Sequence, residues 1–220
     1  MALIDADKPL RKDAERNRQR ILDAARELFA ERGLGVTLND IAHHAGVGVG
    51  TVYRRFPDKA QLVDDLFEQR VEELVALADD ALADADPWHG LTEFLERALD
   101  LQAGDRALHE LIVGTADGMD RVCQIRDRLM PRGVELVQRA QATGQLRGDI
   151  AATDIPVVQL MVGSVMDASR EVAPDLWRRS LDIVLRGLSA RPDAAPPLSA
   201  DALEPEQVDA VMRNYKSARG

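Results

Sequence analysis

The most constraining feature of the sequence is a tight glycine turn between two short amphipathic segments, residues 37–45 and 48–56. Thr37 and Asp40 have the spacing of a capping box, in which each side chain accepts a hydrogen bond from the other residue's backbone N–H. Gly46 follows about two helical turns later, and glycine readily adopts the left-handed conformation in which helices end. The second segment stops before a proline, which cannot continue a helix. The sequence therefore predicts two short helices joined by a tight turn.

Helices are also expected over most of the remaining chain, because apolar residues recur at helical spacing and strictly alternating β-branched runs are missing. A helix over 14–32 has one apolar stripe and ends at Gly33. A longer helix over 59–84 has a wide apolar face. The remaining predicted helices, bounded by start and stop signals, cover 87–103, 105–114, 118–143, 153–172 and 174–190. The predicted fold class is therefore all-α.

The same patterns divide the chain into four parts. Residues 1–13 lack apolar periodicity and are expected to form a flexible arm. Residues 14–58 are expected to form a three-helix helix-turn-helix domain, and residues 59–190 a larger helical domain. Residues 191–220 are rich in proline and alanine, which predicts a mobile tail with room for one short helix over 204–216.

Charge changes sign where the helix-turn-helix pattern ends. Residues 1–59 hold 11 Lys and Arg against 9 Asp and Glu, while residues 60–220 hold 17 against 29. Nucleic acid is therefore attracted to the first part only and repelled by the second. The total formal charge of −10 argues against a protein that coats nucleic acid over its whole surface, but it leaves room for one local basic surface.

The second short helix has the properties of one that enters the major groove of DNA. It is slim, and it carries Thr51, Tyr53, Arg54 and Arg55 on its polar side. Side chains that reach base edges are what direct readout requires, while the preceding helix braces against the phosphate backbone. Taken singly, the arginines are better explained as a solvated face and the tyrosine as half-buried packing. Only the whole pattern favours DNA contact.

That pattern consists of an amphipathic helix ending in ERG, followed by T-x-x-x-I-A-x-x-A-G-V-x-x-G-T-V-Y-x-x-F-x-x-K. It resembles the DNA-binding domain of the TetR family of bacterial transcriptional regulators over about residues 14–62. The resemblance is specific, because residue types, helix lengths and the turn agree together. Beyond residue 62 it is architectural only. It implies an N-terminal helix-turn-helix domain followed by a helical domain for ligand binding and dimerisation.

The resemblance also implies which residues contact DNA. Thr37 would cap its helix and touch a phosphate, and Lys59 would hold a phosphate at the start of the next helix. An arginine near the end of the recognition helix suits guanine, whose O6 and N7 it can bind together. The implied DNA-binding residues are Thr37, Asn39, Val49, Gly50, Thr51, Tyr53, Arg54, Arg55 and Lys59. Further phosphate contacts, or simply a solvated arm, are expected from Lys8, Arg11, Lys12, Arg16, Arg18 and Arg20.

Pairing with a second copy is expected, because one short reading helix sees too few base pairs for genomic specificity. Residues 153–172 and 174–190 resemble the last two helices of the family, which form a four-helix interface across a two-fold axis. The first of them is apolar nearly all round, so it needs cover on both sides. An internal core helix without a partner is the alternative. The predicted interface comprises Val157, Leu160, Met161, Ser164, Val165, Leu181, Val184 and Leu185.

The resemblance further implies a small-molecule pocket between the long helix after the DNA-binding domain and the helices beyond it. Aromatic side chains and methionines make adaptable pocket walls, although the same side chains at helical spacing are more often ordinary core. The candidate lining residues are Phe67, Arg70, Trp88, Phe94, His109, Met119, Cys123 and Met161.

The sequence carries no catalytic, cofactor or metal signature. A nucleophile elbow, a Walker loop, a dinucleotide glycine fingerprint and an HExxH pair are all missing, so an enzyme is not expected. His43 and His44 are adjacent and point to different helix faces, so they cannot share a metal ion. Cys123 is the single cysteine, which excludes a disulfide framework; a redox switch at this thiol is a minor alternative. No apolar run suits a membrane span or a signal peptide, which predicts a cytoplasmic protein.

These observations together predict a ligand-responsive DNA-binding regulator. The resemblance implies a repressor that binds a palindromic operator as a homodimer and is released by a small molecule. The alternative is a ligand-independent or architectural DNA-binding protein whose C-terminal core is filled.

Overall fold

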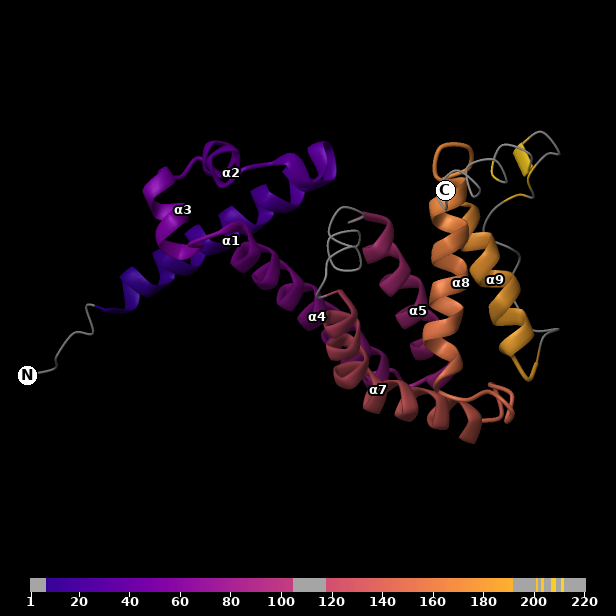
Figure 1. Cartoon of the computed structure of the whole chain (residues 1–220). Helices are drawn as coiled ribbons and strands as arrows, with labels where there is room; N and C mark the ends of the chain where they lie inside the picture. The colour runs from indigo at the N-terminus through magenta and orange to yellow at the C-terminus, as the bar shows by residue number, and fades with distance from the viewer. Residues whose placement is uncertain are drawn as a thin grey trace, which may run out of the picture. The chain divides into compact units, whose positions relative to one another are not determined.

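The computed structural model describes residues 7–104 and 118–191, together with positions 201, 203, 207, 208 and 211. These residues are almost entirely helical, and among them the only strand-like pairing is an antiparallel bridge between Leu146 and Ser189. The helices (Figure 1) are α1 (Asp7–Arg32), η1 (Gly33–Gly35), α2 (Leu38–Ala45), α3 (Val49–Arg55), α4 (Lys59–Ala83), α5 (Pro87–Gly104), α7 (Gly118–Ala142), α8 (Asp154–Ser169) and α9 (Leu176–Leu188). The predicted all-α fold is confirmed.

The first helix starts earlier than the sequence predicts. It begins at Asp7 rather than at residue 14, so the expected arm over 1–13 is helical from residue 7 onward. The stretch has no glycine, and Pro9 falls within the first turn, where a missing N–H costs the helix nothing. A helix can therefore extend through polar residues without an apolar stripe.

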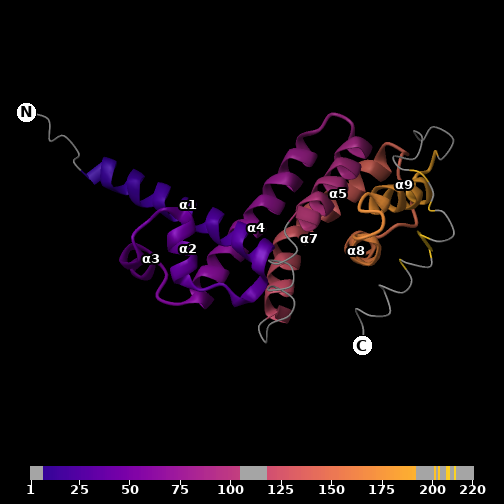
Figure 2. The same ribbon diagram turned by 90° about the horizontal axis from the view of Figure 1, so that it is seen from above.

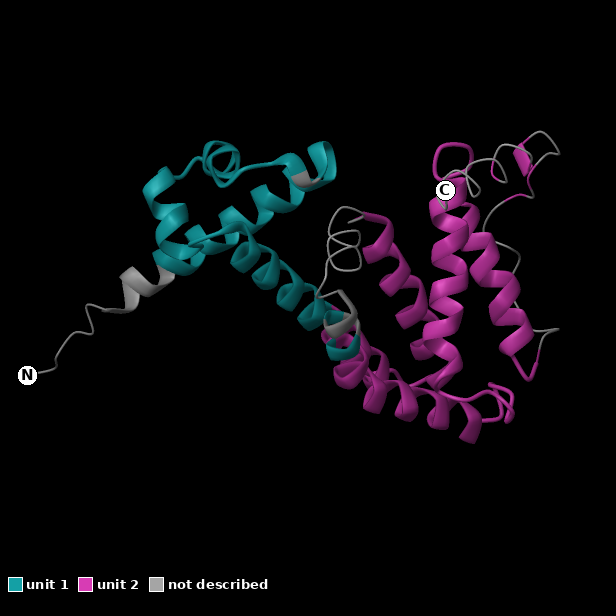
Figure 3. Ribbon diagram, viewed as in Figure 1, with its two compact units in different colours: residues 1–73, 105–124 teal, residues 74–104, 125–220 magenta. Residues whose placement is uncertain are grey.

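The chain forms two compact units (Figure 3), one of residues 1–73 with 105–124 and one of residues 74–104 with 125–220. The boundary lies inside α4 rather than at the predicted position between residues 58 and 59. Leu62 and Leu66 on the first part of α4 are fully buried. One long and two short helices enclose too small a core by themselves, so the apolar face of α4 completes the first unit.

Ion pairs fasten α1 to α4 within the first unit. Arg18 lies 3.1 Å from the Asp65 carboxylate, and Arg26 lies 3.2 Å from the Glu73 carboxylate. All four side chains are partly buried, with 21–30% of each exposed, so solvent screens these pairs less than pairs on an open surface.

The second unit is built around an apolar cluster contributed by the end of α4 and by α5, α7, α8 and α9. Leu91, Leu95 and Leu99 of α5 and Leu136 of α7 are at most 1% exposed. Helices α8 and α9 pack against each other and lie side by side in both ribbon views (Figures 1 and 2). Their observed bounds lie within the predicted ranges 153–172 and 174–190.

Helices α4 and α5 pack closely at the corner between them. A Cβ atom at Gly90 would lie 2.4 Å from the carbonyl oxygen of Ala81. Arg139 of α7 donates hydrogen bonds to the carbonyl oxygens of Leu82 and Asp84, at the end of α4. The absence of a side chain at Gly90 and the arginine cap together hold the end of α4 against α5 and α7.

No helix among the described residues is both long enough and apolar enough to span a membrane. The helix predicted over 105–114 lies outside the described residues. Of the predicted tail helix, positions 207, 208 and 211 are helical.

Candidate functional site

The start of α2 is fixed by the capping box that the sequence predicts. The Thr37 hydroxyl accepts a hydrogen bond from the Asp40 backbone N–H at 3.2 Å, and the Asp40 carboxylate accepts one from the Thr37 backbone N–H at 2.9 Å. The Thr37 hydroxyl also donates to the same carboxylate at 2.6 Å. These donors, the hydroxyl foremost, lower the pKa of Asp40. The first turn of α2 is therefore rigid, with Thr37 and Asn39 exposed beside it.

The end of α2 is held by the left-handed turn and by α1. Gly46 has φ +62°, and its N–H donates to carbonyl oxygens of the last turn. The Arg20 guanidinium of α1 donates to the Ala45 carbonyl at 2.6 Å and to the Gly46 carbonyl at 3.3 Å. His44 lies 2.7 Å from the Glu27 carboxylate of α1. Arg20, expected to supplement DNA contact, thus caps a helix instead.

Helix α3 has one buried face and one exposed face. Val52 and Phe56, which closes its last turn, are both fully buried. On the other side Val49 is 38% exposed and Tyr53 is 47% exposed, and Arg54 and Arg55 are exposed as well. Gly50 and Thr51 lie in the same two turns, and no atom lies within 4 Å of a Cβ built at Gly50. The predicted reading residues therefore share one open helix surface.

The two arginines of α3 differ in their surroundings. Arg54 folds back along its own helix, where its Nε donates to the Gly50 carbonyl at 3.2 Å and its Nη2 donates to the Thr51 hydroxyl at 3.3 Å. The Arg55 guanidinium lies 5.9 Å from the centroid of the Phe56 ring. Arg54 therefore braces Thr51, while Arg55, among the described residues, is held only by a weak contact with an aromatic ring.

The other basic candidates whose side chains are described each contact a neighbouring residue. The Lys59 ammonium lies 5.2 Å from the centroid of the Phe29 ring, and partial burial lowers the pKa of this lysine. Arg18 is occupied by the ion pairs with Asp65 and Glu15. Arg16 forms an exposed pair with Asp13 at 3.5 Å. The side chains of Lys8, Arg11 and Lys12 lie outside the described residues.

The predicted dimer residues fall into two groups. On α8, Val157, Leu160 and Met161 are 51%, 70% and 49% exposed, while Ser164 and Val165 are half-buried. On α9, however, Leu181 is 3% exposed inside its own unit, and Val184 and Leu185 pack partly against the same core. Sequence reasoning missed Ile183, which is 54% exposed. It lies off the apolar stripe of α9, and that departure was the signal available in the sequence.

The predicted ligand-lining residues are divided between the two units. Phe67, Arg70 and Cys123 belong to the first unit, whereas Trp88, Phe94 and Met161 belong to the second. Phe67 and Phe94 are buried core residues, and Met161 faces outward from α8. Arg70 forms an ion pair with Glu73 at 3.1 Å, and Cys123 is half-buried with a free thiol. His109 and the side chain of Met119 lie outside the described residues.

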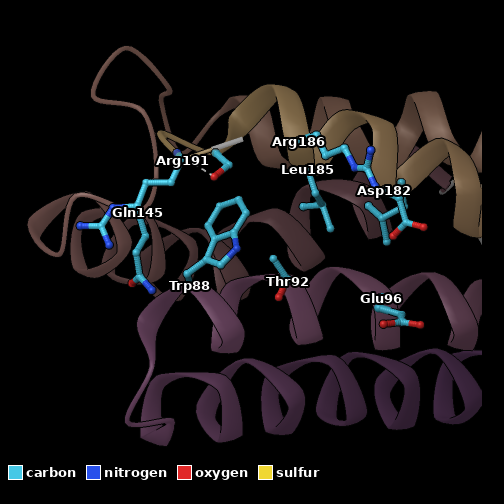
Figure 4. Close-up of a pocket in the computed structure, with 10 residues that line it drawn as sticks. Trp88, Thr92, Glu96, Gln145, Asp182, Leu185, Arg186 and Arg191 are labelled. Atoms are coloured by element: carbon cyan, nitrogen blue, oxygen red, sulfur yellow. Dashed lines mark hydrogen bonds between the residues drawn. The ribbon is translucent and has the colours of Figure 1, made fainter. Parts of the chain in front are cut away.

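A cleft of about 420 Å³ lies instead between α5 and α9 of the second unit (Figure 4). Of the predicted lining residues only Trp88 contributes to it. Its other walls include Thr92 and Glu96 from α5, Leu185 and Arg186 from α9, and Gln145 and Arg191 from the segments that follow α7 and α9. No group of three or more His, Cys, Asp or Glu residues that could hold a metal ion occurs in the described part of the chain.

Comparison with family profiles covers both parts of the chain. Residues 21–66 match the profile described as "Bacterial regulatory proteins, tetR family". Residues 86–190 match the profile described as "Transcriptional regulator SbtR-like, C-terminal domain". The first match covers the helix-turn-helix, and the second covers the helices that line the cleft.

Individual relatives give the same picture. The chain is 30% identical over 159 residues to the HTH-type transcriptional regulator TtgR of Pseudomonas putida, covering 64% of this chain and 76% of that one. An HTH-type regulator of Staphylococcus aureus is 50% identical over 54 residues, which cover 24% of this chain and 29% of its own. A TetR regulatory protein of Mycobacterium vanbaalenii superposes with a TM-score of 0.65 at 33% identity, covering 82% of this chain and 99% of that one. A TetR regulator of Streptomyces coelicolor superposes with a TM-score of 0.64 at 31% identity, covering 78% and 98%.

Proposed function

Because this chain belongs to the TetR family of bacterial DNA-binding transcriptional regulators, we propose that it binds a palindromic operator as a homodimer and represses transcription until a small molecule releases it. Its relatives regulate transcription and are not enzymes. Two observations in one chain carry the proposal, namely an open reading face on α3 and an exposed apolar face on α8.

The reading face supports sequence-specific contact with the major groove. Tyr53 and Arg55 offer a hydroxyl and a guanidinium to base edges or phosphates, and Val49 offers an apolar surface suited to a thymine methyl group. Thr37 and Lys59 flank this face at the starts of α2 and α4, where phosphate contacts would position the helix. The buried side chains Val52 and Phe56 fix the orientation of α3 in its own unit.

The apolar face of α8 supports dimerisation. Val157, Leu160 and Met161 are each about half exposed or more, which is unusual for three large apolar side chains on one helix. A second copy of the same face would cover them, as a two-fold interface brings identical surfaces together. The neighbouring α9 carries a further exposed apolar side chain, Ile183. Such a dimer holds two copies of α3 for two half-sites of a palindrome.

The response to a small molecule follows from the dimer. A ligand that prefers one arrangement of the two protomers shifts the population away from the arrangement that fits the operator. A dimer seated on its operator occupies DNA that the transcription machinery needs, so release of the dimer restores expression. The cleft of about 420 Å³ supports this ligand-responsive function over a ligand-independent protein with a filled C-terminal core.

A genomic-fragment binding selection tests the proposal. The purified full chain, unfolded and refolded to strip any bound ligand, is mixed with fragments at physiological salt, and retained fragments are sequenced. Enrichment of a palindrome, together with twice the chain mass by light scattering, is the expected result. Failure to enrich any sequence from the stripped protein contradicts operator binding, and a monomer that still selects a single half-site contradicts the dimer.

A further inference from the structure

The cleft between α5 and α9 is bounded by two anchors that hold these helices at fixed points. At one end Arg178 of α9 pairs with Glu96 of α5 at 2.7 Å and also with Asp100. At the other end the segment after α7 pairs with the segment after α9. There the Arg147 N–H donates to the Leu188 carbonyl at 3.0 Å. Arg178 thus joins α9 to α5 at one end of the cleft, and a backbone hydrogen bond joins the segments after α7 and α9 at the other.

A ring and two leucines give the cleft an apolar surface. The Trp88 side chain lies between the side chains of Leu185 and Gln145 (Figure 4), and Leu181 forms part of the wall. Trp88 is only partly buried, although it packs against the core cluster. A planar apolar molecule can stack on an exposed indole face and so remove apolar surface from water.

One cation at the cleft is available to pair with an anion. The ionisable lining residues of the cleft are Glu96, Asp182, Arg186 and Arg191, two of each sign. Glu96 shares the Arg178 guanidinium with Asp100, so it is already paired. The Arg191 side chain is exposed and forms no ion pair with any residue in the described part of the chain. Its guanidinium can therefore accept a new carboxylate partner.

Arg191 is nevertheless held in place at the mouth of the cleft. Its backbone N–H donates to the Ser189 hydroxyl at 3.0 Å, and the next residue back, Ala190, donates to the Gln145 carbonyl at 2.8 Å. The Gln145 amide is itself locked, because it donates to the Asp86 carboxylate at 3.0 Å and its oxygen accepts from Thr143 at 2.6 Å. The wall beside Trp88 is thus ordered, and the cation projects from an anchored backbone (Figure 4).

We propose that this cleft binds a planar organic monocarboxylate, whose ring lies on Trp88 and Leu185 and whose carboxylate pairs with Arg191. The assignment deepens the small-molecule response proposed above and rests on it only for the consequence on DNA. That consequence follows from α9, since Ile183 lies two residues from both Leu181 and Leu185, on nearly the opposite side of the helix. A ligand that binds against Leu181 and Leu185 can therefore shift α9, whose opposite side carries the exposed Ile183 of the proposed dimer face.

Calorimetric titration of the full-length protein with 2-naphthoate tests the assignment. The uncharged 2-naphthamide is titrated in parallel, and the variants are Arg191→Gln and Trp88→Leu. Arg97→Gln is the matched control, because Arg97 is an exposed arginine of α5 outside the cleft. Circular dichroism melting checks that each variant folds; Arg191 is exposed, so its substitution leaves the core untouched.

The expected result is saturable binding of one 2-naphthoate per chain. Removing the charge, as in the amide or in Arg191→Gln, should weaken binding about tenfold, the usual effect of losing one charge-assisted hydrogen-bonded pair. The Arg97→Gln control should bind as the parent does. Absence of saturable binding up to about 5 mM, or unchanged affinity in folded Arg191→Gln, overturns the assignment.

The two proposals fail separately. If the cleft does not bind the carboxylate, operator selection by the stripped protein is unaffected. If no operator is selected, carboxylate binding and its dependence on Arg191 still stand. A gel-shift titration with 2-naphthoate on the selected palindrome then reports whether occupancy of the cleft lowers DNA affinity.

Discussion

The guanidinium of Arg20 on α1 donates a 2.6 Å hydrogen bond to the carbonyl oxygen of Ala45, at the last residue of α2. This bond joins residues 25 positions apart and satisfies a carbonyl that a helix end leaves without an intrahelical donor. The angle between α1 and α2 therefore depends on a side chain as well as on apolar packing. Positive charge close to the reading helices thus serves the fold of the domain.

Replacement of Arg20 by glutamine should destabilise the first unit. A partly buried carbonyl loses a charged donor, which costs about 1–3 kcal/mol. Thermal unfolding followed by circular dichroism measures the loss. Arg16→Gln is the control, because Arg16 is exposed and forms an exposed ion pair with Asp13 at 3.5 Å. An equal, small effect of both substitutions would show that the Arg20 cap contributes nothing.

Removal of the capping hydroxyl should loosen α2. Thr37→Val deletes the acceptor for the Asp40 N–H and should cost about 1 kcal/mol, while Thr37→Ser should retain most of the stability. Because the pKa of Asp40 is lowered in the folded state, its contribution is present above the unfolded value of 3.8 and is lost as pH falls. Acid unfolding curves of both variants measure this, and an unaltered acid limb in Thr37→Val would contradict it.

Substitutions on α3 should separate DNA affinity from assembly. Tyr53→Ala and Arg55→Ala should each weaken operator binding by about tenfold without changing the oligomeric state, since both side chains are exposed. Affinity of the parent should also fall steeply with salt, because phosphate contacts release counterions. Fluorescence anisotropy on the selected palindrome measures both effects. Full affinity in either variant would remove that residue from the reading face.

A charge placed on α8 should separate the protomers. Leu160 is 70% exposed in the single chain, so the glutamate in Leu160→Glu remains hydrated in the monomer. In a dimer the same carboxylate would be buried against an apolar surface, which is costly. The variant should be monomeric by light scattering and should lose affinity for the full palindrome. Val208→Glu is the control, since Val208 is an exposed apolar residue of the tail. A dimer that survives Leu160→Glu would place the interface elsewhere.

The ion pair at the end of α4 should make stability depend on pH. His89 lies 2.6 Å from the Asp84 carboxylate, whose hydrogen bond and charge raise the pKa of the histidine above 6.5. The stabilisation is complete below about pH 6.5 and is lost as pH rises through the raised value. The melting temperatures of the parent and His89→Gln should differ at about pH 6 and converge at about pH 9. A difference that stays constant with pH would rule out this charge effect.

Helix bounds were largely predictable because their signals are local. The capping box at Thr37, the left-handed Gly46 and the buried pair Val52 and Phe56 all lie within a few residues of the helices they define. The Arg20 cap was not predictable, because its partner is a carbonyl on another helix and nothing in the sequence marks it. An arginine in a basic stretch looks the same whether it faces DNA or a helix end.

The second unit shows the same limit. Periodicity placed Leu181 and Leu185 on one apolar face of α9, and that face turns into the protein and toward the cleft. Ile183 was overlooked because it breaks the stripe, yet it is the exposed one. The cleft depends on pairing between segments 145–147 and 188–190, which lie more than 40 positions apart and carry no shared pattern.

The packing of Gly90 has a consequence for mutational tolerance. Because a Cβ there would overlap the Ala81 carbonyl oxygen, even alanine is excluded, although α5 would otherwise gain helix propensity from it. In a saturation screen this position should score as poorly for every replacement as the most buried leucine does. A helical glycine that admits no substitute is a landmark by which the α4–α5 corner can be located in divergent sequences, where the surrounding polar residues give no guide.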